Sequence, residues 1–268
     1  MIFDELRKIA KEYNYKLPYW LEKNIEPEIV FTNENNGKRN ILLLHGLFGA
    51  VSNWDNIIEP LKEFANPITI SFPIATGKIS DITISSLTLL TEYFIRKQNF
   101  SNLIVCGNSL GGHVALKLAL ESPHLFDKMI LSGSSGLYEH QVEKLPLKPT
   151  AEFVRNQMEK VFFNKEFITD DGVKSIVDCL LNKKTFLNYV IAAKSAKHDN
   201  LENVLGNINK ETLLLWGEDD EVTPLDIAHT FNKLISNSTL KTIKSCGHAP
   251  MIEHPKWFAD EIKNFITK

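Results

Sequence analysis

The sequence predicts an α/β fold, in which a mostly parallel β-sheet carries helices on both of its faces. Short apolar runs without polar–apolar alternation are typical of parallel strands that are buried on both faces. Four such runs cover residues 41–44, 103–106, 129–131 and 213–216. Helix-period patterns lie between them, at about residues 52–64, 83–97, 109–121, 225–235 and 256–266. Because strands alternate with helices, the connections predict a parallel sheet that is covered on both sides.

Two weaker segments extend the predicted sheet. Residues 67–72 are a weaker apolar run, and residues 238–244 alternate between apolar and polar side chains as an edge strand does. The polar cluster at residues 32–38 indicates a surface turn, because it is rich in Asn and contains Gly. The last helix carries a single apolar stripe, which predicts that one of its faces packs on the core.

The segment from about 137 to about 206 interrupts the alternation of strands and helices. It contains helix-period patterns but no strand pattern, and Pro146 and Pro149 stand near its start. Insertions at strand ends often build binding sites, so a helical lid is favoured over a few extra core helices. The expected organisation is an N-terminal accessory segment (1–26), an α/β core (27–136 and 207–268) and a helical lid (137–206).

Charge and composition argue against several classes of protein. The 268 residues are 43% hydrophobic and 24% charged, which is ordinary for a globular protein and unlike a disordered or fibrous chain. Lys and Arg number 30 against 33 Asp and Glu, and the lysines are spread along the chain. The sequence therefore lacks the basic stripe that nucleic-acid binding requires. We expect a small-molecule substrate, no nucleic-acid or membrane partner, and a monomer or homodimer.

Cysteine usage and the N-terminal residues favour a cytoplasmic location. Cys106, Cys179 and Cys246 are odd in number and widely spaced, so a disulfide framework is not expected. The first residues carry charges where a signal peptide would have an apolar run, and no apolar stretch is long enough to cross a membrane. No metal or cofactor site is predicted, because Cys246 and His248 lack further ligands and no glycine-rich phosphate loop is present.

A candidate nucleophile stands at the junction between a predicted strand and a predicted helix. Gly107, Ser109 and Gly111 form a Gly-x-Ser-x-Gly pattern directly after the apolar run that ends at residue 106. A serine on such a sharp turn needs glycines two residues away, so that neighbouring backbone does not collide with side chains. The pattern predicts a nucleophilic Ser109, and the alternative is a serine that only caps the helix.

A serine nucleophile requires a histidine base and an acid that orients it. His248 is the favoured base, because its loop follows the predicted edge strand and precedes the last helix. His45 also stands at a strand end, but we expect it to shape that loop. The loop after the strand at 213–216 supplies the acid, with Asp219 and Asp220 as the two candidates.

The loop after the first buried strand is the candidate oxyanion hole. Residues 45–49 read His-Gly-Leu-Phe-Gly, and a turn of this kind can present backbone N–H groups. The expected donors are the N–H groups of Leu47 and Leu110, the latter at the start of the helix after Ser109. A hydrophobic turn without a catalytic role is the alternative.

These motifs together resemble the α/β-hydrolase-fold serine hydrolases over about residues 27–268. The order Ser109, Asp220, His248 matches that family's order of nucleophile, acid and base, and the insertion falls where the family has its lid. The resemblance favours Asp220 over Asp219, because Gly217, Asp220 and Pro224 fit the family's Gly-x-x-Asp-x-x-x-Pro frame. The loop at residues 71–80 departs from the family's pattern, since it lacks the usual Asp.

The resemblance implies acyl transfer from a carbonyl substrate to water. An aromatic-rich insertion favours a small or medium, largely apolar carboxylic ester, which predicts a carboxylesterase. The same triad also serves carbon–carbon bond hydrolases of aromatic ring-cleavage products, lactonases and perhydrolases, and these are the enzymatic alternatives. A non-enzymatic small-molecule receptor on the same fold is the alternative from another class.

Overall fold

A computed structural model of the protein describes residues 1–137 and 149–267. Within these residues, seven strands form one sheet in the order β1-β3-β2-β4-β5-β6-β7. The strands are β1 (Phe31–Asn33), β2 (Asn40–Leu44), β3 (Asn66–Ile70), β4 (Leu103–Asn108), β5 (Lys128–Ser132), β6 (Glu211–Gly217) and β7 (Ser238–Ile243). Neighbouring strands are parallel except for β1, which is antiparallel to β3. The predicted fold class, an α/β-hydrolase fold with a mostly parallel sheet, is therefore confirmed.

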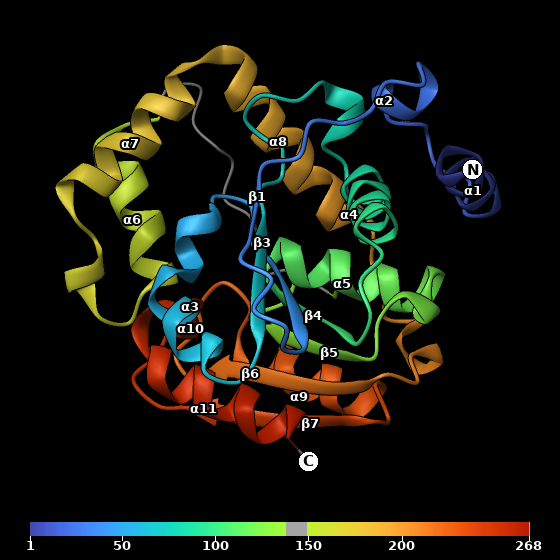
Figure 1. Cartoon of the computed structure of the whole chain (residues 1–268). Helices are drawn as coiled ribbons and strands as arrows, with labels where there is room; N and C mark the ends of the chain where they lie inside the picture. Colours follow the sequence, from blue (N-terminus) through green and yellow to red (C-terminus); the bar gives the residue numbers. More distant parts are fainter. Residues whose placement is uncertain (138–148, 268) are drawn as a thin grey trace.

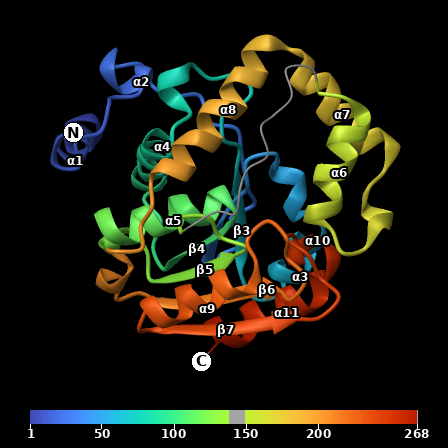
Figure 2. The same ribbon diagram turned by 180° about the vertical axis from the view of Figure 1, so that it is seen from behind.

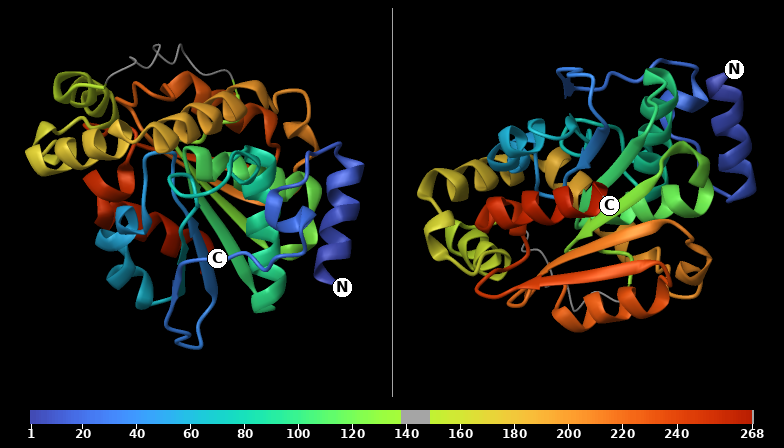
Figure 3. Two further views of the ribbon diagram at one scale, coloured as in Figure 1. Left: turned by 90° about the horizontal axis from the view of Figure 1, so that it is seen from above. Right: turned by 60° about the horizontal axis from the view of Figure 1, so that its bottom comes forward.

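The register of the sheet brings the carboxyl ends of its central strands to one edge. Leu44 pairs with Gly107, Asn108 with Ser132, and Gly217 with the last residue of β7. Figure 3 shows from above how the parallel strands fan out with the twist of the sheet. Side chains that follow β2, β4, β6 and β7 consequently lie at the same edge.

Helices cover both faces of the sheet (Figure 1). The α-helices are α1 (Ile2–Glu12), α2 (Tyr19–Glu22), α3 (Asp55–Lys62), α4 (Ile84–Gln98), α5 (Leu110–Glu121), α6 (Ala151–Val161), α7 (Asp170–Leu181), α8 (Lys183–His198), α9 (Leu225–Leu234), α10 (Pro250–Glu253) and α11 (Pro255–Ile266). Short 3₁₀ helices are η1 (Val51–Trp54), η2 (Ile79–Asp81), η3 (Pro123–Leu125), η4 (Lys165–Phe167) and η5 (Leu205–Asn207). No helix among the described residues is long and apolar enough to span a bilayer.

Side chains alternate along each strand, so one strand contributes to two cores. Ile41 and Leu43 of β2 belong to the core that α3, α10 and α11 cover. Leu42 and Leu44 of the same strand belong to the core under α4, α5 and α9. All four side chains are fully buried. Burial on both faces is the physical reason that these strands read as continuous apolar runs.

The N-terminal segment packs against the outside of α4 (Figure 2). Leu6 of α1 and Leu21 of α2 are fully buried and share a hydrophobic cluster with Leu89 and Leu90 of α4. Tyr15, between the two helices, donates its hydroxyl hydrogen bond to Glu121 at the end of α5. Residues 1–26 therefore pack on the α/β core through a separate small hydrophobic cluster that they form with α4.

A buried ion cluster lies where Tyr15 meets α5. Lys117 lies 3.2 Å from Glu121 and 3.1 Å from Asp199, which follows α8, and His113 lies 3.5 Å from the same Asp199 carboxylate. Burial raises the pKa of Glu121. Burial also acts to raise the pKa of Asp199, but its contacts with His113 and Lys117 together lower that pKa. The cluster joins the N-terminal segment, α5 and the end of α8.

The described part of the predicted lid, residues 149–206, is called the helical insertion. It contains α6, α7 and α8 and, within its described residues, no strand. Its three helices lie over the edge of the sheet where the strands end (Figures 1 and 2). Residues 138–148 of the predicted lid lie outside the described residues. The division at 137 and 206, and the role of this segment as a lid, stay predictions.

The prediction of a surface turn over residues 32–38 was wrong at its start. Phe31–Asn33 forms β1 and pairs with β3, and the hydroxyls of Thr32 and Thr69 lie 2.7 Å apart across the pair. A strand of three residues is too short to give a periodic pattern, and its side chains are largely exposed. The turn itself lies further along, where Gly37 adopts a left-handed backbone conformation with φ of 76°.

Replacing Leu21 with Ala tests whether the N-terminal segment belongs to the core. The substitution removes a fully buried side chain, so we expect the free energy of unfolding to fall by about 2–5 kcal/mol. The matched control is Ile25→Ala, whose side chain is 48% exposed and whose loss should cost less than about 0.5 kcal/mol. Urea unfolding measures both values. Equal midpoints for Leu21→Ala and the wild type would contradict the packing described above.

Candidate active site

Ser109 stands in a strained turn between β4 and α5. Its φ and ψ are 55° and −121°, a left-handed region that a residue with a side chain rarely adopts. Close backbone contacts explain both flanking glycines. A Cβ on Gly107 would lie 2.3 Å from the carbonyl oxygen of Gly111, and a Cβ on Gly111 would lie 2.0 Å from the carbonyl oxygen of Leu44. The turn therefore raises Ser109 above the end of the sheet, as the sequence pattern predicts.

Asp220 is held in a fixed orientation in the loop after β6. Its Oδ1 atom accepts hydrogen bonds from the N–H groups of Val222 and Thr223, each at 2.8 Å. The Thr223 hydroxyl donates to Oδ2 at 2.9 Å. Asp220 is only 4% exposed, whereas the neighbouring Asp219 is exposed. Of the two candidate acids, Asp220 is thus the one that points into the protein.

His248 follows β7 and meets Asp220 directly. Its Nδ1 atom lies 2.8 Å from Oδ2 of Asp220 and 3.3 Å from the Thr223 hydroxyl. Since a carboxylate only accepts, Nδ1 donates its proton to Asp220, and Nε2 is the ring nitrogen that does not contact the carboxylate. The ring packs on the end of β5, where a Cβ on Gly133 would lie 2.7 Å from Nδ1.

Asn108 ties the serine turn to the histidine loop. Its Nδ2 group donates to the carbonyl oxygens of Ser132 at 3.0 Å and of His248 at 3.1 Å. The backbone N–H of Ser109 donates to the same Ser132 carbonyl at 3.0 Å. Ser109 and His248 are therefore anchored at one point, the carboxyl end of β5. Sequence reasoning did not single out Asn108 or Thr223, because neither residue type has a role that spacing alone reveals.

The loop after β2 lies against Ser109. A Cβ on Gly46 would lie 3.1 Å from the Ser109 Cβ, so the loop approaches the serine at the residue before Leu47. Leu110 is the first residue of α5, and the N–H groups of a first helical turn have no partner within the helix. The role of the Leu47 and Leu110 N–H groups as oxyanion donors stays a prediction.

His45 fixes the shape of that loop. Its Nδ1 atom lies 2.8 Å from the Gly46 carbonyl oxygen, to which it donates, and its Nε2 atom accepts the N–H of Phe72 at 3.0 Å. Both contacts are made by the neutral ring, and burial lowers the pKa of His45. The side chain therefore links the loop after β2 to the end of β3.

Cys106 and the possible metal ligands provide no second reactive centre in the part of the chain that the structure describes. Burial raises the pKa of the Cys106 thiol, which lies inside β4. No group of three or more His, Cys, Asp or Glu side chains in the described ranges has the arrangement of a metal site.

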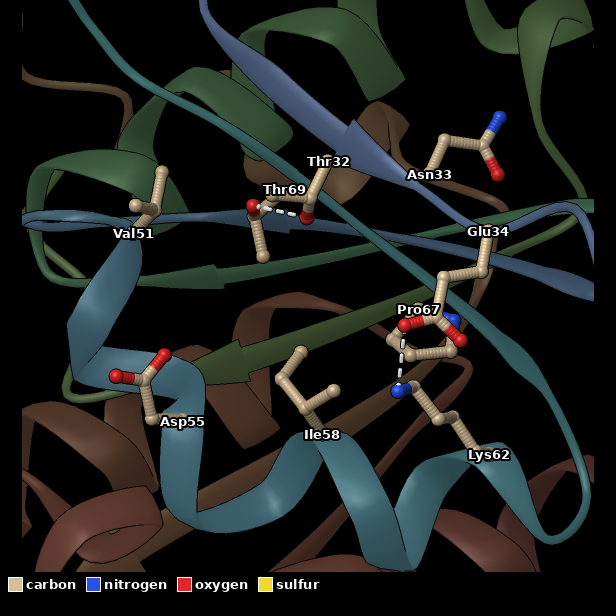
Figure 4. Close-up of a pocket in the computed structure, with 9 residues that line it drawn as sticks. All are labelled: Thr32, Asn33, Glu34, Val51, Asp55, Ile58, Lys62, Pro67 and Thr69. Atoms are coloured by element: carbon tan, nitrogen blue, oxygen red, sulfur yellow. Dashed lines mark hydrogen bonds and ion pairs between the residues drawn. The ribbon is translucent and has the colours of Figure 1, made fainter.

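A surface cavity of about 180 Å³ lies elsewhere, beside α3, the edge strand β1 and its neighbour β3. Figure 4 shows the Thr32–Thr69 hydroxyl pair and the Glu34–Lys62 ion pair among its lining residues. None of the candidate catalytic residues lines it. We therefore assign the chemistry to the edge of the sheet and not to this cavity.

The fold and this arrangement of residues define the class as the serine hydrolases of α/β-hydrolase fold. The family model described as serine aminopeptidase, S33, matches residues 80–255, which is more than half of the chain. The chain belongs to that family and is a hydrolase.

Individual relatives agree with this class. The chain is 28% identical over 270 residues to 2-hydroxy-6-oxononadienedioate/2-hydroxy-6-oxononatrienedioate hydrolase 1 of Pseudomonas putida, covering 91% of this chain and 93% of the relative. A solved serine hydrolase involved in carbazole degradation is 27% identical, with a TM-score of 0.73 and coverage of 88% and 93%. The meta-cleavage product hydrolase of Pseudomonas fluorescens IP01 has a TM-score of 0.78 at 19% identity, with coverage of 89% and 94%, and so shares the fold.

Replacing each acid of the loop after β6 separates the two candidates. Asp220→Asn removes the carboxylate that orients His248, so we expect kcat to fall by about 10³- to 10⁴-fold. Asp219→Asn is the matched control, and its activity should stay close to wild type because an exposed charge is screened by solvent. Steady-state kinetics, with any substrate that the wild type turns over, measure kcat for both variants. Equal losses would mean that the acid is not Asp220.

The lowered pKa of His45 predicts a pH dependence of stability. The folded pKa lies below the unfolded value of 6.5, so the folded chain binds fewer protons than the unfolded chain as the pH falls. The stability that the neutral ring contributes is therefore complete above about pH 6.5 and is lost as the pH falls through the lowered pKa. Denaturant unfolding at about pH 7.5 and about pH 5 should give a larger loss for the wild type than for His45→Gln. An equal loss in both proteins would argue against a neutral His45.

Proposed function

We propose that the protein is a serine hydrolase that cleaves a carbon–carbon bond beside a ketone carbonyl. The observation that carries this choice of bond is the 28% identity, over nearly the full length of both chains, to a 2-hydroxy-6-oxononadienedioate/2-hydroxy-6-oxononatrienedioate hydrolase. Further relatives of the same name, from other bacteria, are 22–25% identical and support the same choice. This choice replaces the ester as the favoured substrate.

The proposed roles follow from the geometry at the edge of the sheet. His248 Nε2 takes the proton of the Ser109 hydroxyl, and Oγ attacks the ketone carbon. Asp220 holds the imidazole and stabilises its positive charge through the 2.8 Å contact. The N–H groups of Leu47 and Leu110 stabilise the oxyanion.

Breaking the carbon–carbon bond leaves an acyl group on Ser109 and an electron pair on the departing carbon. The departing side accepts the electron pair in its conjugated 2-oxo tautomer, which forms when the 2-hydroxyl proton moves to the carbon beside the ketone. His248 then returns its proton to the departing group. Water, deprotonated by His248, then attacks the acyl-enzyme and releases a carboxylic acid. The sum is one ketone and one water converted into one acid and one shorter product.

A largely apolar carboxylic ester is the second candidate, and the charges of the helical insertion favour it. The relatives that support the first candidate are named for a dioate, which carries two carboxylates. Arg155, the candidate for binding such a group, is already paired with Asp170 and donates to the Ile168 carbonyl. Lys194 is exposed on α8. Near the oxyanion loop, Phe48 stacks on Tyr189 with centroids 4.7 Å apart.

A substrate comparison with the purified protein and Ser109→Ala tests the proposal. The panel contains 2-hydroxy-6-oxo dienoates with one and with two carboxylates, and p-nitrophenyl butyrate. We expect kcat/KM to be at least about tenfold higher for the better dienoate than for the ester, and kcat to fall by at least about 10³-fold in Ser109→Ala. Because the monoacid requires no second cation, we expect it to be the better dienoate.

The opposite outcomes identify the alternatives. Ester turnover without cleavage of either dienoate would replace the first candidate with the second. Tight binding of a panel member without multiple turnover would contradict hydrolysis and favour a receptor. Undiminished turnover in Ser109→Ala would exclude Ser109 as the nucleophile.

A further inference from the structure

One carboxylate holds both the histidine loop and the helical insertion. Glu253 ends the short helix α10, which begins two residues after His248. Its Oε1 atom accepts the N–H of Gly247 at 2.7 Å, and its Oε2 atom accepts the N–H of Asn164 at 2.9 Å. Gly247 directly precedes His248, and Asn164 follows α6 in the insertion. We call this pair of hydrogen bonds the carboxylate clasp.

The two segments that the carboxylate clasp joins also touch each other through their backbones. The N–H of His248 donates to the carbonyl oxygen of Val161, the last residue of α6, at 2.7 Å. A Cβ on Gly247 would lie 2.3 Å from that same oxygen. The histidine loop therefore takes its position partly from the end of α6 and not from the sheet alone.

The residue after Glu253 holds the other end of the loop. His254 Nε2 lies 2.9 Å from the carbonyl oxygen of Ser245, which itself adopts a left-handed conformation with φ of 54°. The Cys246 thiol lies 3.8 Å from Glu253 Oε1, and burial, with a contribution from Glu253, raises the pKa of that thiol. Cys246 therefore faces Glu253 as a neutral thiol.

We infer that Glu253 is a positioning residue, which sets the place of His248 above Ser109 and couples it to the helical insertion. The inference rests on the proposed role of His248 as the base. Glu253 bonds to backbone groups of residues 164 and 247 and not to the reacting side chains, so it acts through the loop. Loss of the carboxylate frees the loop at the residue next to the base, so that Asp220 alone no longer fixes the position of the imidazole.

The test compares Glu253→Gln and Glu253→Ala with the wild type and with Asp260→Asn. Asp260→Asn is the matched control, because it removes a carboxylate that pairs only at the surface, with Lys256 on α11. Glu253→Gln keeps one acceptor oxygen and the shape of the side chain, so it remains informative where Glu253→Ala fails to fold. Three readouts are collected: thermal unfolding, kcat and KM per folded molecule, and the rate at which a fluorophosphonate labels Ser109.

We expect kcat and the labelling rate to fall by about 10- to 100-fold in Glu253→Ala, with KM changed less than about threefold, because the base is misplaced and binding is not. The kcat and labelling rate of Glu253→Gln should lie between those of Glu253→Ala and the wild type. Asp260→Asn should have the values of the wild type. A merely structural role would lower the melting temperature and leave kcat per folded molecule unchanged.

The outcomes separate this inference from the proposed function. If the wild type reacts with the fluorophosphonate and the folded Glu253 variants react at the same rate, the inference about Glu253 is overturned and the proposed function is not. A folded wild type that the fluorophosphonate does not label would overturn the nucleophile itself, and the inference with it.

Discussion

The buried contact between Asp220 and His248 is the interaction on which the arrangement of the site depends. A carboxylate that is 4% exposed loses most of its hydration, and it is stable only when hydrogen-bond donors replace the lost water. Two backbone N–H groups, the Thr223 hydroxyl and the His248 ring supply them. This requirement fixes the loop after β6 and the loop after β7 relative to each other. An imidazole held in a fixed orientation at the edge of the sheet is the consequence.

Much of the fold follows from the sequence because parallel strands buried on both faces have a pattern of their own. The run at residues 103–106 marks β4, and the Gly-x-Ser-x-Gly pattern marks the turn because close backbone contacts admit only glycine there. β1 was missed, since three largely exposed residues have no periodicity. Asp220 was preferred to Asp219 by a motif frame, and burial supplies the physical reason.

The contacts that sequence reasoning could not supply join distant segments. Glu253 meets Asn164 across 89 positions of the chain, and Asn108 meets His248 across 140. A pattern indicates which loops gather at one edge of a sheet, but the reach of one side chain to another segment depends on packing. For the same reason the sequence indicated a helical insertion, without indicating that two of its helices, α6 and α8, contact different loops at the edge of the sheet. The end of α6 contacts the histidine loop through Val161, and α8 contacts the loop after β2 through Tyr189.

The buried ion cluster beside α5 limits how far the chain can be truncated from its C-terminus. Lys117, on the helix that begins next to the nucleophile, is neutralised by Glu121 and by Asp199. Tyr15 donates a hydrogen bond to one oxygen of Glu121, so the ammonium group depends on segments from both ends of a long stretch of polypeptide. A fragment that stops before residue 199 leaves an ammonium without one of its counter-charges in an apolar interior, a heavy penalty. Lys117 on the helix behind the serine therefore gains its second carboxylate partner only after residue 199 has been synthesised.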